Sequence, residues 1–485
     1  MLRTHRLAAR RHGSGRPGAA GGVSTPLRTA ALIIGGVLAL APAAATAQEP
    51  QRDSIPTDVR VGILYQPVFR PGIVVPVIPA PSELSEVADS ARAIILRDLD
   101  YGDRLEVMSL GEDIPHEGPV NYGLWDELGA VWLLIGVIEG PADAPVLRLS
   151  LHDVVFRLLQ DVRAFELPPL RHPAFRMALH RAADQVVRWA TSSTGIAATR
   201  IAYVDRSPGG LEVFLVDSDG FGLRRLSSDS SIAYSPAWSP SGDRIAYMSY
   251  QAGDPAIYEL DLNPGTSSLL VDLPGMDMTP TYSPDGTLLG FAATVEGRTE
   301  IYTYNLAERC CARRLTYARF ANSLSPTFSP DGRRFAFNSD RLGQLHVFVQ
   351  NTQDGSAELI TRYIYDQSVH NAAPDWSPTG DRIAFHGWVE GVPQIFTVAP
   401  DGRGLRQLTQ EGRNEDPSWA PDGRHIVFAS TRGGIAGLWV LDVVSGRIRR
   451  LVRSAEARLP DWSGRLDSTS LVGDTAAAGR NRDNP

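Results

Sequence analysis

Pro326-Thr-Phe-Ser-Pro-Asp-Gly332 is one of six related segments in this chain. Its Ser-Pro-Asp-Gly part suits a tight hairpin turn, because Pro fixes φ near the start of the turn and Gly accepts a positive φ at its end. The aromatic residues of successive segments are 44, 46, 48, 43 and 43 residues apart. This spacing predicts the four-stranded blades of a β-propeller. The six segments are Pro236-Ala-Trp-Ser-Pro-Ser-Gly242, Pro280-Thr-Tyr-Ser-Pro-Asp-Gly286, Pro326-Thr-Phe-Ser-Pro-Asp-Gly332, Pro374-Asp-Trp-Ser-Pro-Thr-Gly380, Pro417-Ser-Trp-Ala-Pro-Asp-Gly423 and Pro460-Asp-Trp-Ser-Gly464.

Short alternating strands follow the turns, as in Arg334-Phe-Ala-Phe337, and indicate one buried face per strand. Arg200-Ile-Ala-Tyr203 has the pattern of a second strand without a first, whereas Trp462 marks a first strand with nothing after it. Together they complete one blade. We therefore predict a six-bladed propeller over residues 199–466 whose last blade is closed by both ends of the domain, which removes open sheet edges.

Length and composition allow a large core and two domains, since the chain has 485 residues of which 43% are hydrophobic. All 47 basic residues are Arg. The lack of Lys excludes a Walker A lysine and a Schiff-base lysine. The formal charge is -8, and residues 1–47 hold six Arg and no acidic residue, so the remainder carries 41 minus 55, or -14. Such an acidic protein is not expected to bind nucleic acid.

The first 47 residues are expected to be a cleavable secretory signal peptide. A basic stretch precedes an apolar run over residues 30–41, and cleavage is predicted between Ala47 and Gln48. A membrane anchor is the alternative, but about 12 apolar residues are too few to span a bilayer. Arg10-Arg11 suggests a twin-arginine signal only weakly, because apolar residues do not follow closely. Residues 48–57 should form a flexible extension, and residues 467–485 a disordered tail.

Residues 58–195 are predicted to form a compact α/β domain, so that the chain is mainly β with an α/β N-terminal part. The apolar run from Ala130 to Ile138 suits a central strand covered on both faces. The other expected elements are strands at 58–64, 104–108 and 146–151, and helices from 82 to about 101, around 124–128 and over 175–189.

The reactive side chains of the sequence indicate no catalytic constellation, cofactor site or metal site. Adjacent Cys310 and Cys311 are expected to be outer-strand thiols without a role, with a vicinal disulfide as the alternative. His370, His386 and His425 are expected on loop or strand surfaces, and the Asp-Gly of Asp217-Ser-Asp-Gly220 is interpreted as turn chemistry rather than as a calcium loop. The nucleophile elbow of α/β-hydrolases does not occur. We therefore expect no enzyme.

The Ser-Pro-Asp-Gly, Ile-Ala-Phe and Arg-Leu-Thr repeats resemble those of the TolB family, the periplasmic propeller component of the Tol-Pal system. Similar repeats occur in propellers attached to prolyl-oligopeptidase-like hydrolases, but the order of parts is more specific. A signal peptide precedes an α/β domain containing Gly72-Ile-Val-Val-Pro76 and Leu128-Gly-Ala-Val-Trp-Leu-Leu-Ile-Gly136, and Thr199-Arg-Ile-Ala-Tyr-Val204 opens the ring. The resemblance covers residues 58–466.

This resemblance implies a function and partners. In that family the propeller mouth receives the peptidoglycan-associated lipoprotein Pal, a free N-terminus contacts the inner-membrane protein TolA, and the system supports outer-membrane integrity and constriction at division. It implies a non-enzymatic periplasmic adaptor that is monomeric, peripheral to the outer membrane and free of cofactors. Residues 48–57 precede Asp58-Val-Arg-Val61, which resembles the family's N-terminal strand, so a TolA contact would involve this extension.

Candidate partner-binding residues lie in the variable loops that lead into the repeated segments. Variable loops gathered on one face of a rigid ring are a common place for binding, and they offer Arg, aromatic and amide groups that protein interfaces favour. Residues 276–279 match a loop of the family's Pal-binding mouth. The candidates are Met276, Asp277, Thr279, Arg319, Phe320, Asn322, His370, Arg413 and Asn414.

Two other functions remain open from the sequence. The chain could be an accessory or gating propeller of a peptidase system, although a hydrolase region of its own is missing. It could also be a ligand-sensing propeller that binds a small molecule in its central channel.

Overall fold

The computed structural model describes residues 69–109, 118–228, 231–263, 265–361 and 370–466. The expected signal peptide, N-terminal extension, strand at 58–64 and C-terminal tail lie outside these residues. Within the described ranges, no helix combines the length and apolar character needed to cross a membrane.

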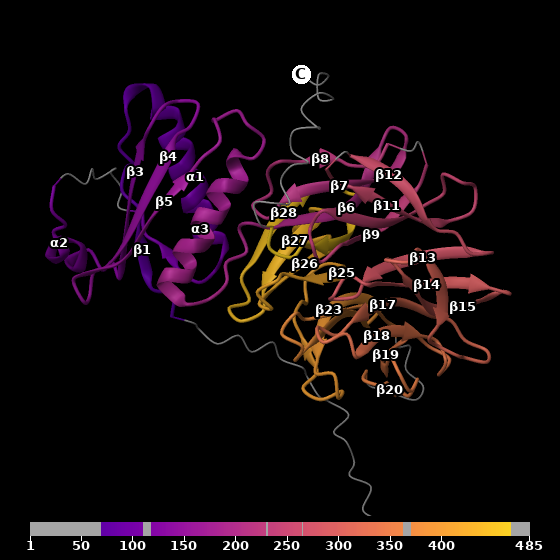
Figure 1. The fold of residues 1–485 in the computed structure, drawn as a ribbon. Coiled ribbons are helices and arrows are strands. Elements are labelled where there is room, and N and C mark those ends of the chain that lie inside the picture. The colour runs from indigo at the N-terminus through magenta and orange to yellow at the C-terminus, as the bar shows by residue number, and fades with distance from the viewer. Residues whose placement is uncertain (1–68, 110–117, 229–230, 264, 362–369, 467–485) are drawn as a thin grey trace, which may run out of the picture. The chain divides into compact units, whose positions relative to one another are not determined.

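Six four-stranded antiparallel sheets form the larger part of the fold (Figure 1). Their order along the chain confirms the prediction of a six-bladed propeller. We number the blades one to six and give their strands from inner to outer. Blade one consists of β9 (Ala233–Trp238), β10 (Arg244–Ser249), β11 (Ala256–Asp261) and β12 (Thr266–Val271), and blade two of β13 (Met276–Tyr282), β14 (Leu288–Val295), β15 (Arg298–Asn305) and β16 (Cys310–Arg314). Blade three consists of β17 (Ser323–Phe328), β18 (Arg334–Ser339), β19 (His346–Asn351) and β20 (Ala357–Leu359), and blade four of β21 (Asn371–Trp376), β22 (Ile383–Val389), β23 (Val392–Val398) and β24 (Arg406–Gln407). Blade five consists of β25 (Asn414–Trp419), β26 (His425–Ser430), β27 (Gly437–Asp442) and β28 (Ile448–Arg453), and blade six of β29 (Arg458–Trp462), β6 (Arg200–Ser207), β7 (Gly210–Asp217) and β8 (Arg224–Arg225).

Blade six joins the two ends of the propeller, as predicted. Its inner strand β29 pairs with β6, and Trp462 lies opposite Ile201. Arg200 and Ser463 are joined twice: the Arg200 N–H donates to Ser463 Oγ, and the Ser463 N–H donates to the Arg200 carbonyl oxygen, both at 2.9 Å. These contacts close the ring, because they give β6 an inner partner and tie the two ends of the propeller together.

The aromatic residues of the six repeated segments are all buried, with exposed fractions of 9% or less. Each packs within the apolar layer between its own blade and a neighbour. The interpretation of these residues as blade core is therefore confirmed.

Every inner strand has a residue of left-handed backbone conformation immediately before its repeated Pro, and the pairing with the second strand shifts there. Such β-bulges bend a strand and redirect its side chains. All six bulge residues line a central cavity of about 270 Å³. They are Ser235, Thr279, Ser325, Ala373, Asp416 and Leu459, with φ between 48° and 54°.

The N-terminal unit is a five-stranded mixed sheet in the order β2-β1-β3-β4-β5, with α1 and α3 packed on one face and α2 against the other (Figure 1). The apolar stripe of α1 packs against α3 and the sheet, as the spacing predicts. The elements are β1 (Gly72–Val74), β2 (Glu106–Val107), β3 (Trp132–Glu139), β4 (Val146–Asp153), β5 (Leu158–Glu166), α1 (Ser85–Tyr101), α2 (Tyr122–Glu127) and α3 (Phe175–Thr191), with 3-10 turns at Ser82–Leu84 and, in blade five, Arg432–Gly434.

Two features of this sheet differ from the sequence prediction. The structure contains β1 and β5, which the sequence analysis does not predict. The central strand β3 is not covered on both faces along its whole length, because Val137 is exposed.

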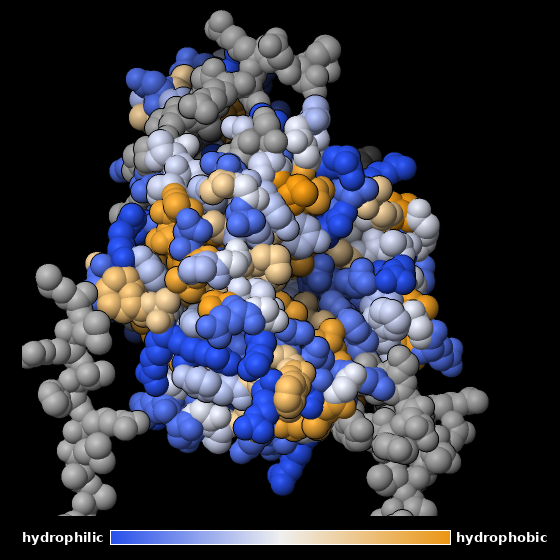
Figure 2. Space-filling view, turned by 90° about the vertical axis from the view of Figure 1, so that its right-hand side faces the viewer, coloured by the Kyte–Doolittle hydropathy of each residue, from blue (hydrophilic) through white to orange (hydrophobic). Residues whose placement is uncertain are grey.

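The side of the molecule shown in Figure 2 has small groups of apolar residues between hydrophilic ones. This mixture is usual for a surface in water, where single exposed apolar side chains are common.

Candidate protein-binding face

The propeller presents two kinds of chain connection on its two faces. Because neighbouring strands in each blade are antiparallel, the turns after the first and third strands share one face, and the connections after the second and fourth strands share the other. We call these the turn face and the loop face. All nine candidate residues lie in an inner strand or in the loop before it, where the loop face begins.

The loop between β16 and β17 carries Arg319 and Phe320 into solvent. Phe320 is 92% exposed, the largest exposed fraction of any large apolar side chain in the described part of the chain. The loop beneath it is fixed by Glu300, whose buried Oε1 accepts hydrogen bonds from the Ala318 N–H at 2.7 Å and from Arg314 at 2.6 Å. A loop that is already anchored loses little backbone freedom when one of its side chains binds a partner.

Asn322 connects blades two and three at the end of the same loop. Its Oδ1 accepts a hydrogen bond from the Thr299 N–H at 3.3 Å, and its Nδ2 donates to Asp340 Oδ2 at 3.3 Å. The side chain is exposed but already bonded on both sides. We infer that Asn322 supports the Arg319–Phe320 loop.

His370 belongs to a small aromatic group on blade four. Its ring centroid lies 5.0 Å from that of Trp388 and 6.3 Å from that of His386. Burial lowers the pKa of His386 to about 4 and also lowers the pKa of His370, so both rings are neutral at pH 7. The expectation that His386 lies on the surface is wrong, since it is only 8% exposed, whereas Trp388 is 42% exposed. The group offers a neutral aromatic surface.

Arg413 and Asn414 are adjacent but play different parts. Arg413 is exposed, pairs with Glu415 at 3.0 Å and lines a surface depression together with Val392. Asn414 has no exposed area, and its Nδ2 donates to Gln394 Oε1 at 2.8 Å. Asn414 therefore holds the loop in place, and its side chain is not available to a partner.

Residues of β13 also separate into exposed and buried positions. Met276 is 41% exposed, but Asp277 is 1% exposed and its Oδ2 accepts a hydrogen bond from the Leu273 N–H at 2.7 Å. Burial raises the pKa of Asp277 to about 6. Thr279 faces the central cavity and bonds to the Ser325 N–H at 3.3 Å. The structure thus brings Met276, but not Asp277, to the surface.

Three carboxylates line the central cavity, and the sequence analysis does not single them out. Asp375 Oδ2 accepts the Trp419 N–H at 2.7 Å, and Asp461 Oδ2 accepts the Trp238 N–H at 2.6 Å, so each bridges two blades. Burial raises the pKa of Asp375 and of Asp416 to about 6 and that of Asp461 to about 7. Their role in the structure is to join blades.

The substitution Asp461→Asn should stabilise the protein at pH 8 relative to wild type, by roughly 1 to 2 kcal/mol. Because the pKa of Asp461 is raised in the folded protein, the folded state favours the protonated carboxyl group. The contribution of Asp461 to the free energy of unfolding therefore falls as the pH rises from about 4 through 7. The amide keeps an oxygen for the Trp238 N–H and cannot ionise. Urea unfolding at pH 5 and pH 8 tests this, with the exposed Asp401→Asn as control. An equal pH dependence in wild type and Asp461→Asn would contradict the expectation.

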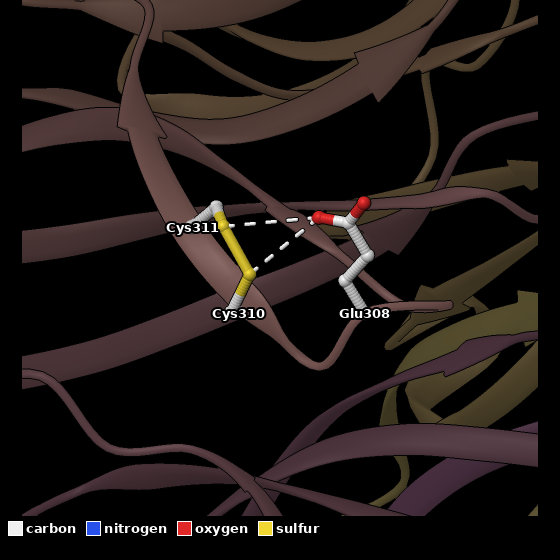
Figure 3. Close-up of side chains that lie close together, drawn as sticks. All are labelled: Glu308, Cys310 and Cys311. Carbon is white, nitrogen blue, oxygen red and sulfur yellow. Dashed lines mark hydrogen bonds between the residues drawn. A yellow bond between two sulfur atoms is a disulfide. The ribbon is translucent and has the colours of Figure 1, made fainter.

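Cys310 and Cys311 form a vicinal disulfide on β16 (Figure 3), so the expectation of two unlinked thiols is wrong. Glu308 Oε2 lies 3.6 Å and 3.9 Å from the two sulfur atoms. A disulfide sulfur carries no proton, so these are contacts and not hydrogen bonds. The pair follows a turn-face connection and lies away from the Arg319–Phe320 loop.

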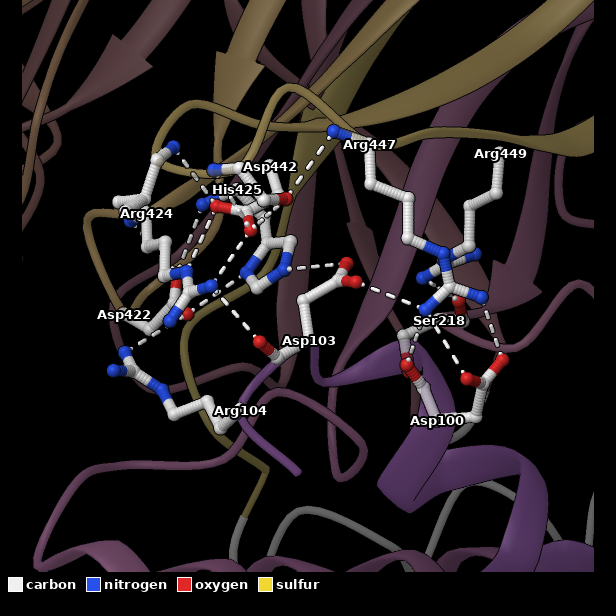
Figure 4. A network of polar contacts seen from close by, with 12 residues as sticks. Asp100, Asp103, Arg104, Ser218, Asp422, Arg424, His425, Asp442, Arg447 and Arg449 are labelled. Atoms are coloured by element: carbon white, nitrogen blue, oxygen red, sulfur yellow. Dashed lines mark hydrogen bonds and ion pairs between the residues drawn. The ribbon is translucent and has the colours of Figure 1, made fainter. Parts of the chain in front are cut away.

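On the turn face, a buried ionic network joins the α/β unit to blade five (Figure 4). Asp103, just after α1, lies 3.3 Å from His425 Nε2 and 2.9 Å from Arg447 Nη1. His425 Nδ1 is 2.8 Å from Asp422. Burial alone would lower the pKa of His425, but Asp422 and Asp103 outweigh it and raise this pKa to about 9. The expectation that His425 lies on a surface is wrong, because it is fully buried.

A second buried network joins α1 and α3 to blade six. His180 Nδ1 lies 2.7 Å from Asp98, and Arg176 pairs with Asp219 on the turn after β7. Arg200 Nε is 3.0 Å from Asp217. The two Asp residues of the Asp217-Ser-Asp-Gly220 turn therefore face cations of the protein.

Both networks contain Asp and His side chains close enough to share a metal ion: Asp98, His180 and Asp219 in one, and Asp103, His425 and Asp442 in the other. Arginines already neutralise these carboxylates, as in the 2.6 Å pair of Arg424 and Asp442. A histidine ligand must also be neutral to bind a metal, whereas His180 and His425 both have raised pKa values. The chemistry of these groups favours ion pairs.

Comparison with known proteins agrees with the fold. The family model described as the TolB beta propeller domain matches residues 188–369 and 361–478. The Tol-Pal system protein TolB of Desulfosudis oleivorans is 31% identical over 194 residues, which is 40% of this chain and 43% of that protein. The corresponding protein of Methylobacillus flagellatus is 34% identical over 160 residues, 32% of this chain and 36% of that protein.

The crystal structure of TolB from Acinetobacter baumannii matches more of the chain. It has a TM-score of 0.71 and 26% sequence identity, and the match covers 83% of this chain and 99% of that one. The sequence matches, in contrast, span less than half the length of the two curated relatives.

Proposed function

Because the chain belongs to the TolB β-propeller family, we propose that it is a non-enzymatic adaptor that binds another protein within a Tol-Pal-like system of the cell envelope. The observation that supports this most directly is the Arg319–Phe320 loop, which exposes an aromatic and a cationic side chain on a backbone fixed by Glu300. Interfaces often centre on such aromatic and Arg residues. The α/β unit contacts the turn face at blades five and six, whereas the Arg319–Phe320 loop lies on the opposite, loop face.

The proposed partner at the loop face is a Pal-like peptidoglycan-associated lipoprotein. The neutral aromatic group of His370 and Trp388 and the exposed Met276 extend the surface around the loop face. A TolA-like inner-membrane protein is the proposed second partner, bound through residues 48–57. In this role the protein would support outer-membrane integrity and constriction at division.

We propose that the protein acts in the periplasm after removal of residues 1–47. The oxidised Cys310–Cys311 pair supports this location. Disulfides persist in oxidising compartments such as the periplasm and are rare in the reducing cytosol.

The double substitution Arg319→Glu with Phe320→Ala should weaken binding of the soluble part of a Pal-like lipoprotein about thirty-fold, equivalent to about 2 kcal/mol. Both side chains are exposed, so the change should leave the fold intact. Isothermal titration calorimetry on the mature protein measures the affinity.

A matched control is Arg403→Glu with Phe156→Ala. Both residues are exposed, but Arg403 lies on the turn face and Phe156 lies on the α/β unit. Unchanged binding in the loop variant, or an equal loss in the control, would remove the case for the loop face as the binding site.

A further inference from the structure

Glu308, Cys310 and Cys311 form a compact group at the start of β16 (Figure 3). The Glu308 N–H donates to Asn305 Oδ1 at 3.0 Å, which fixes the turn between β15 and β16. Arg309 and Cys311 both have the left-handed backbone conformation, and the pairing of β15 with β16 shifts beyond Cys310. This bulge turns the exposed Cys311 out of the regular strand. The turn and the bulge together place both sulfur atoms beside the Glu308 carboxylate.

This group differs from the two buried ionic networks in its charge. Among the described residues, three clusters bring carboxylates, histidines or cysteines close enough to share a metal ion. Arginines neutralise the carboxylates of the other two clusters. Glu308 pairs with no arginine in the described part of the chain, and the neighbouring Arg309 lies 3.6 Å from Glu259 instead. The Glu308 carboxylate is therefore available to a cation from solution.

We propose that reduction of the bond between Cys310 and Cys311 creates a binding site for a thiophilic divalent cation, with Zn²⁺ as the expected ion. The ligands are the two thiolates and Glu308 Oε2. Zinc binds cysteine sulfur and carboxylate oxygen, and soft thiolates select it over Mg²⁺ and Ca²⁺. Two adjacent cysteines alone would be a sparse ligand set, and Glu308 supplies the third ligand. Water completes the tetrahedron, as in zinc sites that keep one position open.

The distances between the ligand atoms fit such a site. With Zn–S bonds of about 2.3 Å and Zn–O bonds of about 2.0 Å, a sulfur and an oxygen ligand of a tetrahedral zinc ion lie about 3.5 Å apart. Glu308 Oε2 lies 3.6 Å from Cys310 Sγ and 3.9 Å from Cys311 Sγ. The carboxylate is thus already near the required distance from both sulfur atoms. Only the sulfur atoms have to separate, since two thiolates on one zinc ion lie about 3.8 Å apart.

The disulfide keeps this site closed until a dithiol reduces it. A thiolate of the dithiol attacks the exposed Cys311 Sγ, the S–S bond breaks, and Cys310 leaves as a thiolate. The second thiol of the reductant then displaces Cys311 and closes the reductant's own disulfide. Two electrons pass from the dithiol to the cysteine pair, and the two protons of the dithiol pass to the cysteine sulfur atoms. Binding of the cation releases these two protons, because only thiolates are ligands.

The test compares the oxidised and the reduced mature protein. Dithiothreitol reduces the folded protein, gel filtration without oxygen removes the reagent, and a thiol assay counts the two cysteines. Titration with CdCl₂ follows the ultraviolet absorption of thiolate–cadmium bonds, with Cd²⁺ as a probe because zinc gives no such absorption. Reduced protein should bind one Cd²⁺ per chain and release two protons. Oxidised protein should show neither effect.

Variants test the three ligands separately from the fold. The double substitution Cys310→Ser with Cys311→Ser should abolish the cadmium absorption. Zinc affinity, measured by competition with a chromophoric chelator, should fall at least about ten-fold in Glu308→Gln, because loss of an outer-shell partner alone has an effect of this size. The matched control is Glu358→Gln, an exposed glutamate on the outer strand β20 of blade three, which should bind zinc as wild type does.

Four results would overturn the proposal. Absence of free thiols after treatment with dithiothreitol would show that the pair stays closed in the folded protein. Absence of cadmium binding by the reduced protein would show that the three groups do not form a site. Equal binding by the oxidised protein or by the double serine variant would place the ion elsewhere. Equal zinc affinity in Glu308→Gln and wild type would exclude the carboxylate as a ligand. Unchanged melting temperatures confirm that the variants are folded.

Discussion

Replacing Arg424 by Met should lower the free energy of unfolding by about 3 to 5 kcal/mol. Its Nε and Nη2 donate to the two carboxylate oxygens of Asp442 at 2.8 and 2.6 Å, and Nη2 also donates to the Asp103 carbonyl oxygen at 2.9 Å. Asp442 has no exposed area. Burial opposes its ionisation, but Arg424 and Ser445 outweigh burial and lower the pKa of Asp442 to about 2. Without Arg424 the carboxylate loses its closest cation in a buried site.

Urea unfolding should be measured beside Arg403→Met. Arg403 pairs with Asp401 at 3.8 Å on the surface, and both side chains are mostly exposed, so its loss should cost less than about 1 kcal/mol. The double variant Arg424→Met with Asp442→Leu should recover part of the loss, because no isolated charge remains buried. Equal losses for Arg424→Met and Arg403→Met would contradict the assignment of a buried ion pair.

The second large effect is a loss of stability at alkaline pH through His425. Its pKa rises to about 9 in the folded protein from an ordinary value of 6.5. The stability that protonated His425 contributes is therefore fully present below pH 6.5 and is lost as the pH rises through 9. A shift of this size corresponds to about 3 kcal/mol. The chain has no Lys and both cysteines are oxidised, but the pKa of His180 is also raised, to about 10, so only a comparison with a His425 variant isolates His425.

The measurement is urea unfolding of wild type and His425→Gln at pH 6.5 and pH 9.5. Wild type should lose about 2 to 3 kcal/mol more than the variant between these values. The variant should be less stable than wild type at pH 6.5, because Asp422 and Asp103 lose their cationic partner. The half-exposed His172→Gln serves as control and should behave as wild type. If wild type and His425→Gln lost the same free energy of unfolding between pH 6.5 and pH 9.5, His425 would be excluded as the source of the pH dependence.

The six blades could be predicted because each repeat has three features that can be recognised locally in the sequence: a turn, an aromatic core residue and a strand of period two. The strand β5 gave no such signal, since nearly all its side chains are exposed and it therefore lacks a hydrophobic period. The bulges before the repeated Pro residues were also not predicted. The residues that adopt the left-handed conformation differ in type, as Ser235, Ala373 and Leu459 illustrate.

The candidate site was predicted in outline, but not the direction of each side chain. Phe320 and Met276 are exposed, whereas Asn414 and Asp277 have the same loop context and point inward. Partner binding by the exposed residues stays a prediction. The ionic network was missed because Asp422 has the sequence context of a turn residue, while its partner Arg104 lies 318 residues earlier. One local signal existed: His425 stands where Arg244 and Arg334 open the corresponding strands of other blades.

Blade six cannot close until the ribosome has made both ends of the propeller. Trp462 bonds to Thr199 across 263 residues, and at about 5 to 20 residues per second a ribosome needs roughly 13 to 50 s to make that length. During this interval β6 has no inner partner, and the ring is incomplete. Until Trp462 has been made, the chain therefore contains no finished propeller. The same delay leaves the inner edge of β6 unpaired, and an unpaired strand edge can pair with other chains before the ring closes.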